Sequence, residues 1–290
     1  MTVFWTTGEL RARGKSSRQI RRAVGERVIR EVRRGHFAAV DADVDVIRAV
    51  RVGGVATAST GTRAMGIWTP PDPPAGWSPG RGGERRNVLR IALPRTASRL
   101  RDADDASAPF VPRPDVMLHW TAAADLAGSG RTRIAPILVL LEHTFRSQPP
   151  ELALAVLESA LHLRFLRPND LAALAARLPA HLAPVVAAAD GRSESGVETI
   201  VRFRLLRRGL RVEILVGLRG IGSVDLLVEG VLIIECDGRE FHDDAEAFER
   251  DRTRDLTAAR RRYRTLRVTW FQALFRWSAV EDAVFAALGR

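Results

Sequence analysis

The chain has 290 residues, which is enough for about two domains. Hydrophobic residues make up 46%, so the chain can bury a core and general disorder is excluded. There are 45 Lys and Arg residues against 34 Asp and Glu residues, and the net charge of +11 favours a polyanionic partner such as nucleic acid. Lys15 is the only lysine, so chemistry that needs a lysine is excluded beyond that position.

Cysteine content and hydropathy bear on the compartment. The single cysteine, Cys236, cannot form an intrachain disulfide, which fits a reducing compartment. The N-terminus lacks the apolar region of a signal peptide. The longest apolar run, near Ile134–Leu141, is far below the roughly 20 residues of a membrane span. We therefore expect a cytoplasmic protein with no membrane partner.

Residues 1–44 predict a winged helix-turn-helix domain. Thr6 and Glu9 have the spacing of a capping box, which opens a helix by satisfying its first amides. Ser16 and Gln19 repeat this spacing and predict a second helix directly after the first. Two short helices in succession are the core of that DNA-binding fold.

Positive charge gathers on this predicted domain. Alternating residues around a turn at Arg34 and Gly35 predict a two-stranded wing. The second helix carries Arg18, Arg21 and Arg22, which with Arg34 are candidate contacts to DNA phosphates. The alternative is a small helical subdomain with a solvated basic face.

Residues 45–189 predict a middle region of mixed α/β structure in which we recognise no chemistry. A Pro- and Gly-rich linker covers Thr69–Asn87. The pattern predicts strands over Val88–Leu93 and Asp115–Thr121, and helices over Glu151–Leu166 and Asn169–Leu178.

Residues 190–290 predict a third domain, so we expect a multidomain α/β (α+β) protein. The long helical crossover before the last strand suits a parallel strand joined to an antiparallel meander, hence a mixed sheet flanked by helices. The predicted order is helix Val197–Arg208, strands Val212–Val216, Ser223–Glu229 and Val231–Asp237, helix Ala245–Arg262, strand Tyr263–Trp270 and helix Ser278–Leu288.

Three acids interrupt these apolar strands, although central strands rarely bury a carboxylate without a partner. Glu235 and Asp237 share one strand face by the period of two. Asp225 joins them only if it pairs with Glu235, which requires an odd-numbered loop such as residues 229–231. A two-residue loop would send Asp225 to the other face.

Three clustered carboxylates repel one another, and a divalent cation would relieve that repulsion. Oxygen ligands favour Mg²⁺ or Mn²⁺, and such an ion can activate water and stabilise charge on a phosphodiester. The alternative is a structural role, in which the acids pair with arginines such as Arg252 or Arg267.

The C-terminal pattern resembles proteins grouped with very-short-patch-repair (Vsr) endonucleases, in the PD-(D/E)XK nuclease superfamily. The resemblance covers about residues 193–290, and the N-terminal segment resembles the winged helix of abortive-infection (AbiEi-like) antitoxins. The matching C-terminal positions are Ser195, Glu198, Asp225, Glu235, Cys236, Asp237, His242, Arg250, Asp251, Arg252, Asp255 and the run from Leu266 to Trp270.

The resemblance implies roles for the acids. Asp225 and Glu235 would be metal ligands, with the backbone carbonyl of Cys236 as a third. Glu198 would orient a metal-bound water, unless it is simply a solvated helix residue. The superfamily has a lysine two residues after the second acid, and this chain has Asp237 there. Asp237 would instead complete a second metal position or hold a histidine.

Three more residues are candidates for the reaction. His242 follows a predicted turn and can titrate near neutrality, so it is the best candidate for proton transfer; a capping histidine is the alternative. Arg250 or Arg254, four apart on a predicted helix, would face the scissile phosphate. The alternative is that rows of opposite charge on that helix merely offset one another.

These observations predict a metal-dependent DNA endonuclease targeted by a winged helix. The alternative is a non-catalytic, antitoxin-like transcriptional regulator, favoured by the absent lysine, in which the nuclease fold is a binding or homodimerisation module. An RNA-directed nuclease is the weakest hypothesis, because no glycine-rich aromatic motif offers a stacking platform for single strands.

Overall fold

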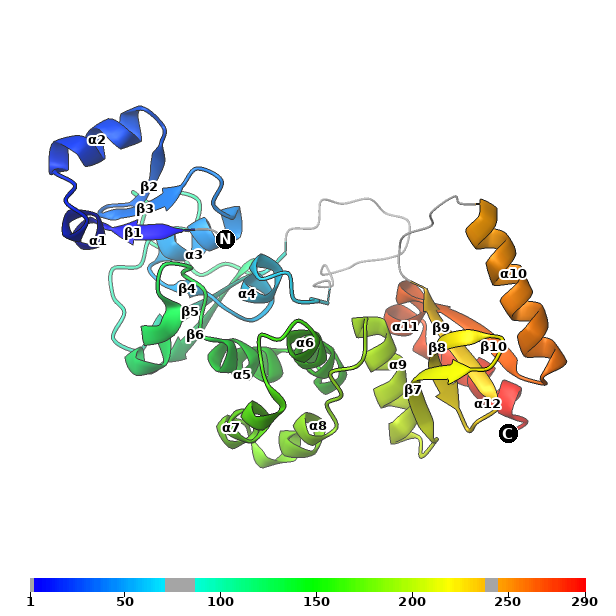
Figure 1. Ribbon diagram of the computed structural model, residues 1–290. Helices are drawn as coiled ribbons and strands as arrows, with labels where there is room; N and C mark the ends of the chain where they lie inside the picture. The colour runs from blue at the N-terminus through cyan, green and yellow to red at the C-terminus, as the bar shows by residue number, and fades with distance from the viewer. Residues whose placement is uncertain (1–2, 71–86, 238–244) are drawn as a thin grey trace. The chain divides into compact units, whose positions relative to one another are not determined.

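A computed structural model describes residues 3–70, 87–237 and 245–290, without the side chains of Asp237 and residues 245–251. It is a mixed α/β structure with three sheets (Figure 1). The chain forms two compact units: unit 1 comprises Met1–Gln148 and Asn169–His181, and unit 2 comprises Pro149–Pro168 and Leu182–Arg290. The division at residues 44/45 and 189/190 stays a prediction.

Unit 1 begins with two short helices and a three-stranded sheet of order β1-β3-β2. Both predicted capping boxes are present, at Thr6 with Glu9 and at Ser16 with Gln19. The turn predicted at Gly35 is also present, with a φ of 78°. The elements are β1 (Phe4–Thr6), α1 (Thr7–Ala12), α2 (Ser17–Gly25), β2 (Ile29–Arg33) and β3 (His36–Ala39).

The rest of unit 1 is built around a second sheet of order β4-β5-β6, in which β5 and β6 are parallel. Both strands predicted here are confirmed to within a residue or two, and so is the helix over 169–178. Helices α3 and α4 lie where the sequence predicts mixed helix and loop, over residues 45–68, whereas α5 was not predicted. The elements are α3 (Val44–Val52), β4 (Val55–Ala56), α4 (Ala58–Ala64), β5 (Leu89–Pro94), β6 (Val116–Thr121), α5 (Ile137–Ser147) and α7 (Leu171–Arg177).

Unit 2 contains a four-stranded sheet of order β10-β9-β8-β7, with β10 parallel to β9 and the other pairs antiparallel. This is the mixed sheet predicted from the sequence. The order of elements predicted for residues 190–290 is confirmed, with α11 as one additional helix among the described residues of this segment. The elements are α6 (Pro150–His162), α8 (Ala183–Ala187), α9 (Gly196–Arg207), β7 (Val212–Leu218), β8 (Gly222–Val228), β9 (Leu232–Asp237), α10 (Ala245–Arg260), β10 (Arg264–Thr269), α11 (Trp270–Phe275) and α12 (Trp277–Leu288).

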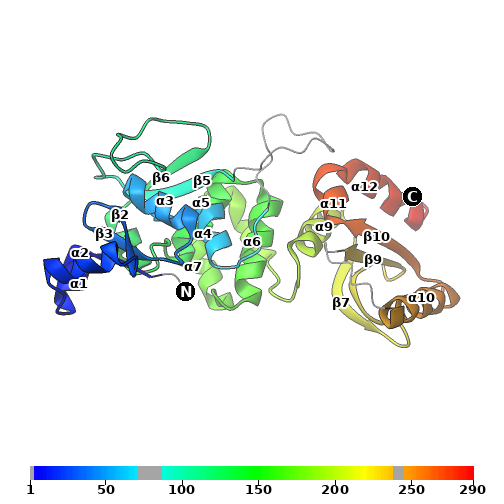
Figure 2. The ribbon, with the colours of Figure 1, turned by 90° about the horizontal axis from the view of Figure 1, so that it is seen from above.

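Helices cover both faces of this sheet (Figures 1 and 2). On one face, Leu226 and Ile234 pack in a cluster with residues of α9, α11 and α12. On the other face, Leu227 and Ile233 pack in a cluster with Ala258 of α10. Both central strands are therefore covered, and a carboxylate on either of them is withdrawn from bulk water.

Helix α6 joins unit 2 through charges that it buries against α9. Glu158 on α6 is 0% exposed and pairs with Arg202 on α9. The same carboxylate accepts hydrogen bonds from Thr199 Oγ1 at 2.6 Å and from the backbone amide of Asp190 at 2.7 Å. A buried ion pair needs such donors to satisfy its remaining lone pairs, and here they are provided.

Among the described residues, no helix is both long enough and apolar enough to cross a membrane.

Candidate functional site

The hairpin of β8 and β9 brings Asp225 close to Glu235. The ladder pairs Val228 with Leu232 and Leu226 with Ile234, which leaves the predicted three-residue turn over residues 229–231. The two acids directly follow the last paired residues of this ladder, one on each strand. The Asp225 carboxylate accepts a hydrogen bond of 2.8 Å from the backbone amide of Cys236, which confirms that it reaches β9.

The sheet is irregular at this point. Val224 packs on the α10 side and Leu226 on the α9 side, although residues two apart on a regular strand share a face. The adjoining residue of β7, Leu215, has a φ of 49°, a left-handed conformation that strains a residue other than glycine. Strained backbone of this kind occurs often at functional sites. No signal in the sequence marks Leu215, which lies in an ordinary apolar run.

Glu235 experiences both burial and a like charge. Its side chain is 23% exposed. Burial and then the charge of the Asp225 carboxylate raise the pKa of Glu235 to about 7, while Arg254 opposes the shift. Glu235 is therefore close to half-protonated at neutral pH, which is unusual for a carboxylate and typical of a site that binds a cation or transfers a proton.

Glu198 is a third acid near the pair. It lies in the first turn of α9, where Ser195 caps the helix, and it is only 5% exposed. Its Oε2 accepts a hydrogen bond of 3.0 Å from the backbone amide of Glu194, and no cation pairs with it among the described residues. Burial raises the pKa of Glu198, and Asp225 adds to the shift. The alternative of a solvated helix residue is therefore wrong.

Arg254 lies against this acidic pair from α10. Its guanidinium donates to the backbone carbonyls of Ile221 at 2.8 Å and Ser223 at 2.7 Å. It also lies 3.4 Å from Glu235 Oε1. The hydrogen bonds connect α10 to the start of β8, and the guanidinium places a positive charge beside Glu235. A contact between Arg254 and a DNA phosphate stays a prediction.

The arginines that we considered as structural partners of the acids have another partner. Arg252 and Arg267 lie 3.4 Å and 3.3 Å from the carboxylate of Asp255. Arg267 nevertheless lowers the pKa of Glu235, as Arg254 does, and the Asp225 carboxylate accepts a hydrogen bond from the Cys236 amide.

Part of the predicted site lies beyond the structural description. Asp237 is at the end of β9, where its backbone pairs with Thr269, but its side chain is outside the described residues. The same holds for the side chain of Arg250 and for all of His242. In the described part of the chain, no three His, Cys, Asp or Glu side chains are close enough to hold a metal ion. The predicted convergence of three carboxylates is therefore not observed there.

The candidate DNA contacts of unit 1 are all on its surface. Arg18, Arg21 and Arg22 on α2 are exposed, as is Arg34 in the turn between β2 and β3. Arg22 pairs with Glu26 at 2.6 Å, an exposed ion pair that contributes little to stability. The other three have no side-chain partner within the described ranges, so their charge is available to an anion.

The sequence matches no protein-family model and no curated protein.

Proposed function

We propose that the protein is a metal-dependent endonuclease that hydrolyses phosphodiester bonds in DNA. The observation that carries this proposal is the closeness of the Asp225 and Glu235 carboxylates on two central strands. The charge of Asp225 raises the pKa of Glu235, although Arg254 and Arg267 lower it. Proteins rarely retain such an arrangement for stability, because buried carboxylates repel one another and are costly to desolvate.

A divalent cation fits this arrangement. Mg²⁺ is commonly held by one or two carboxylates, with water and phosphate oxygens as its other ligands. Asp225 and Glu235, with the backbone carbonyl of Cys236, would hold Mg²⁺ or Mn²⁺. Such an ion supplies a polarised phosphodiester and an activated water. The raised pKa of Glu235 supports this fit, because a bound cation would stabilise the ionised carboxylate.

The protein's own residues would complete the site. Glu198 is buried beside the pair and lacks a cation, so its carboxylate is suited to orient a water or accept its proton. The position of the superfamily's lysine is occupied by Asp237, so no ammonium can assist at that place. His242 remains the proposed group for proton transfer to the leaving oxygen.

Unit 1 would bring the protein to its substrate. The exposed arginines of α2 and of the adjoining turn supply salt-sensitive attraction to the DNA backbone. The helix pair and the following strands agree with a winged helix-turn-helix, in which the second helix lies against the major groove. A cytoplasmic location agrees with the free thiol of Cys236.

A second function, a DNA-binding regulator without catalysis, is favoured by one observation. Arg254 pairs with Glu235, and an ion pair can take the place of a metal. In that case the sheet of unit 2 serves as a binding or dimerisation module.

Plasmid cleavage distinguishes the two functions. Full-length protein is incubated with supercoiled plasmid in the presence of Mg²⁺ or Mn²⁺, and nicked and linear products are quantified. The nuclease proposal expects cleavage that Asp225→Asn and Glu235→Gln each reduce by at least about a hundredfold, while DNA affinity is unchanged.

The control is Glu213→Gln, which removes an exposed carboxylate of the neighbouring strand β7. It should cleave like the unmodified protein. If folded protein binds DNA but does not cut it with either metal, the regulator is correct. If cutting survives both site substitutions, the acidic pair is not the active site.

A further inference from the structure

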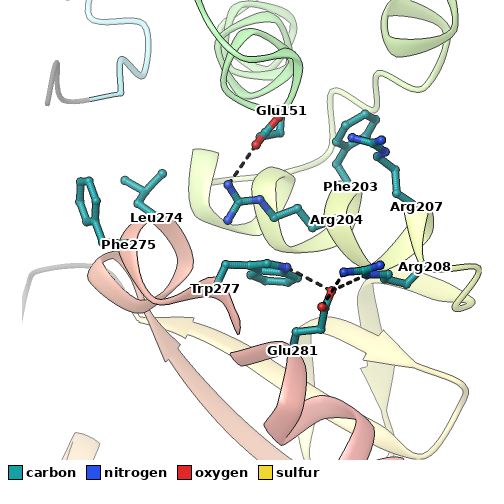
Figure 3. Close-up of a pocket in the computed structure, with 9 residues that line it drawn as sticks. All are labelled: Glu151, Phe203, Arg204, Arg207, Arg208, Leu274, Phe275, Trp277 and Glu281. Atoms are coloured by element: carbon teal, nitrogen blue, oxygen red, sulfur yellow. Dashed lines mark hydrogen bonds and ion pairs between the residues drawn. The ribbon is translucent and has the colours of Figure 1, made fainter. Parts of the chain in front are cut away.

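Unit 2 has a cavity of about 530 Å³ whose lining does not include the acidic pair (Figure 3). It lies among α6, the C-terminal half of α9 and the segment where α11 meets α12. Helix α9 contributes Arg204 and Arg207, and Arg208 directly follows it, whereas α11 and α12 contribute Phe275 and Trp277. Its volume is within the range of small-ligand sites, about 300–1,000 Å³.

Two of the arginines are held in place by neighbouring groups. Arg204 donates to Glu151 at 3.0 Å and to the backbone carbonyl of Ala273 at 2.6 Å, and its guanidinium lies 5.1 Å from the centre of the Trp277 ring. Arg208 makes two hydrogen bonds to Glu281, at 2.6 and 2.7 Å. A guanidinium has five N–H donors, so each retains donors for a ligand after these bonds are made.

The third arginine of the cavity is Arg207. Arg207 is exposed and has no side-chain partner among the residues the structure describes. In Figure 3 it lies beside Phe203, away from the two carboxylates. Three guanidinium groups face only two carboxylates here, so the cavity has a net positive charge. It is suited to an anion, and the forked geometry of arginine suits a phosphate.

The remaining lining suits a planar ring with amino groups. Phe203, Phe275 and Trp277 offer aromatic surface on which a nucleobase can stack. Glu151 and Glu281 can accept hydrogen bonds from the exocyclic amino group of a base. The lining therefore provides a counterpart for each part of a nucleotide: its phosphate, its ring and its amino group.

We propose that this cavity binds a nucleoside monophosphate, with the phosphate at Arg207 and Arg208 and the base against Phe275. The nucleotide is either free or the terminal unit of a DNA strand. Glu198 and Arg207 are nine residues apart on α9, so a rise of 1.5 Å per residue separates them by about 14 Å. The cavity is thus a second site, and binding there does not require cleavage at the acidic pair.

Isothermal titration calorimetry of the full-length protein, without added metal, tests the proposal. The probes are deoxyadenosine monophosphate, deoxyribose 5-phosphate, and a short DNA strand with or without a 5′-phosphate. Deoxyadenosine monophosphate should bind at least about fivefold more tightly than the sugar phosphate, because base stacking adds to the attraction.

Three substitutions assign the contacts. Arg207→Gln should weaken both nucleotide and sugar phosphate by about tenfold, because it removes a charged donor. Phe275→Leu should weaken only the nucleotide. Arg260→Gln is the matched control: it removes an exposed arginine on α10, outside the cavity, and should change nothing. Asp225→Asn should also leave binding unchanged, which separates this test from that of the nuclease.

The titrations distinguish a free nucleotide from the end of a DNA strand as the ligand of the cavity. Binding of the free nucleotide, with the expected losses, identifies a free nucleotide as the ligand. Binding only of the 5′-phosphorylated strand, with the same losses, identifies the end of a DNA strand. The proposal is overturned if neither binds, if Arg207→Gln behaves like Arg260→Gln, or if Phe275→Leu leaves nucleotide affinity unchanged.

Discussion

Two glutamates of unit 2, Glu158 and Glu235, are withdrawn from water but have neighbours of different charge. Burial raises the pKa of both Glu158 and Glu235. At Glu158 the ion pair with Arg202 and the hydrogen bond from Thr199 oppose that shift. At Glu235 the neighbouring carboxylate of Asp225 adds to it, and Arg254 opposes it from 3.4 Å.

The difference separates a structural carboxylate from one available for chemistry. Where donors and a cation satisfy a buried carboxylate, it holds two helices together and has little capacity left for a ligand. Where two carboxylates lie close together, as at Asp225 and Glu235, their mutual repulsion opposes ionisation and lowers stability. A metal ion or a proton can then bind and supply what the fold does not.

The largest expected effect is at the satisfied glutamate. Arg202→Met leaves the Glu158 carboxylate buried and unpaired, so it should lower the unfolding free energy of unit 2 by about 3–5 kcal/mol. Hydrogen exchange of the α9 and β8 amides measures this in the full-length protein. The double substitution Glu158→Met with Arg202→Met should recover much of the lost stability. If Arg202→Met alone costs less than about 1 kcal/mol, Glu158 is not a structural carboxylate that depends on Arg202.

Glu235 should show the opposite behaviour, and it depends on pH. Its folded pKa of about 7 is above the ordinary value of 4.5, so its contribution to stability is fully present below pH 4.5 and is lost as pH rises to 7. Each pH unit in that window corresponds to about 1.4 kcal/mol. Glu235→Gln cannot titrate, so it should be about 3 kcal/mol more stable than the unmodified protein above pH 7 and equal to it at pH 4.5.

Denaturation across this pH range, followed by the same amides, measures the difference. Above pH 7, Mg²⁺ should reduce the stability difference between Glu235→Gln and the unmodified protein, because it stabilises only the protein that retains Glu235. The stabilisation should be about 2.7 kcal/mol when the Mg²⁺ concentration is a hundred times the dissociation constant. A stability difference that does not vary with pH would show that the pKa of Glu235 is not raised in the folded protein.

Glu198 should give a smaller effect with the same sign. Glu198→Gln removes a buried charge close to Asp225 while keeping an oxygen that accepts the Glu194 amide. We expect the unfolding free energy at neutral pH to be unchanged or to rise by about 1 kcal/mol. Urea denaturation measures it, and a clear loss of stability would place Glu198 with the structural acids instead.

The smallest effect concerns the turn that sets the register. Gly230 has a φ of 71°, and a Cβ added there would lie 3.0 Å from a terminal nitrogen of Arg211. Gly230→Ala should therefore cost about 1 kcal/mol. If the register is correct, the Cys236 amide should keep its protection from hydrogen exchange, because its acceptor is the Asp225 carboxylate. Loss of that protection without loss of stability would indicate a different pairing.

Much of the fold of unit 2 could be predicted because its elements are marked locally. Its strands are short apolar runs between turns, and α9 is opened by Ser195 and followed by Gly209. Helices α5 and α11 were missed for different physical reasons. Helix α5 begins with an unbroken apolar run that shows no helical period, and only Pro136 before it marks its start. Helix α11 has six residues and follows β10 directly, so only the capping pair of Thr269 with Gln272 marks it.

The acidic pair could be predicted because strand period and turn length fix which residues face one another. The bonds of Arg254 could not, since Ile221 and Ser223 lie more than thirty residues earlier in the chain. The same applies to Glu158 and Arg202, which are 44 residues apart and whose pairing brings α6 into unit 2. Such contacts depend on tertiary packing, which no local pattern encodes.

Helix α6 sets a limit on how this protein can be divided. A fragment cut at residue 190 would encode the sheet and its carboxylates, yet it would expose the Arg202 side of α9 to water without a counter-ion. A fragment that contains all of unit 2 has to start at Pro149, so it also contains residues 169–181, which belong to unit 1. Recombination that separates the two units at a single point would therefore break one of them, and the chain is expected to be inherited and engineered as a whole.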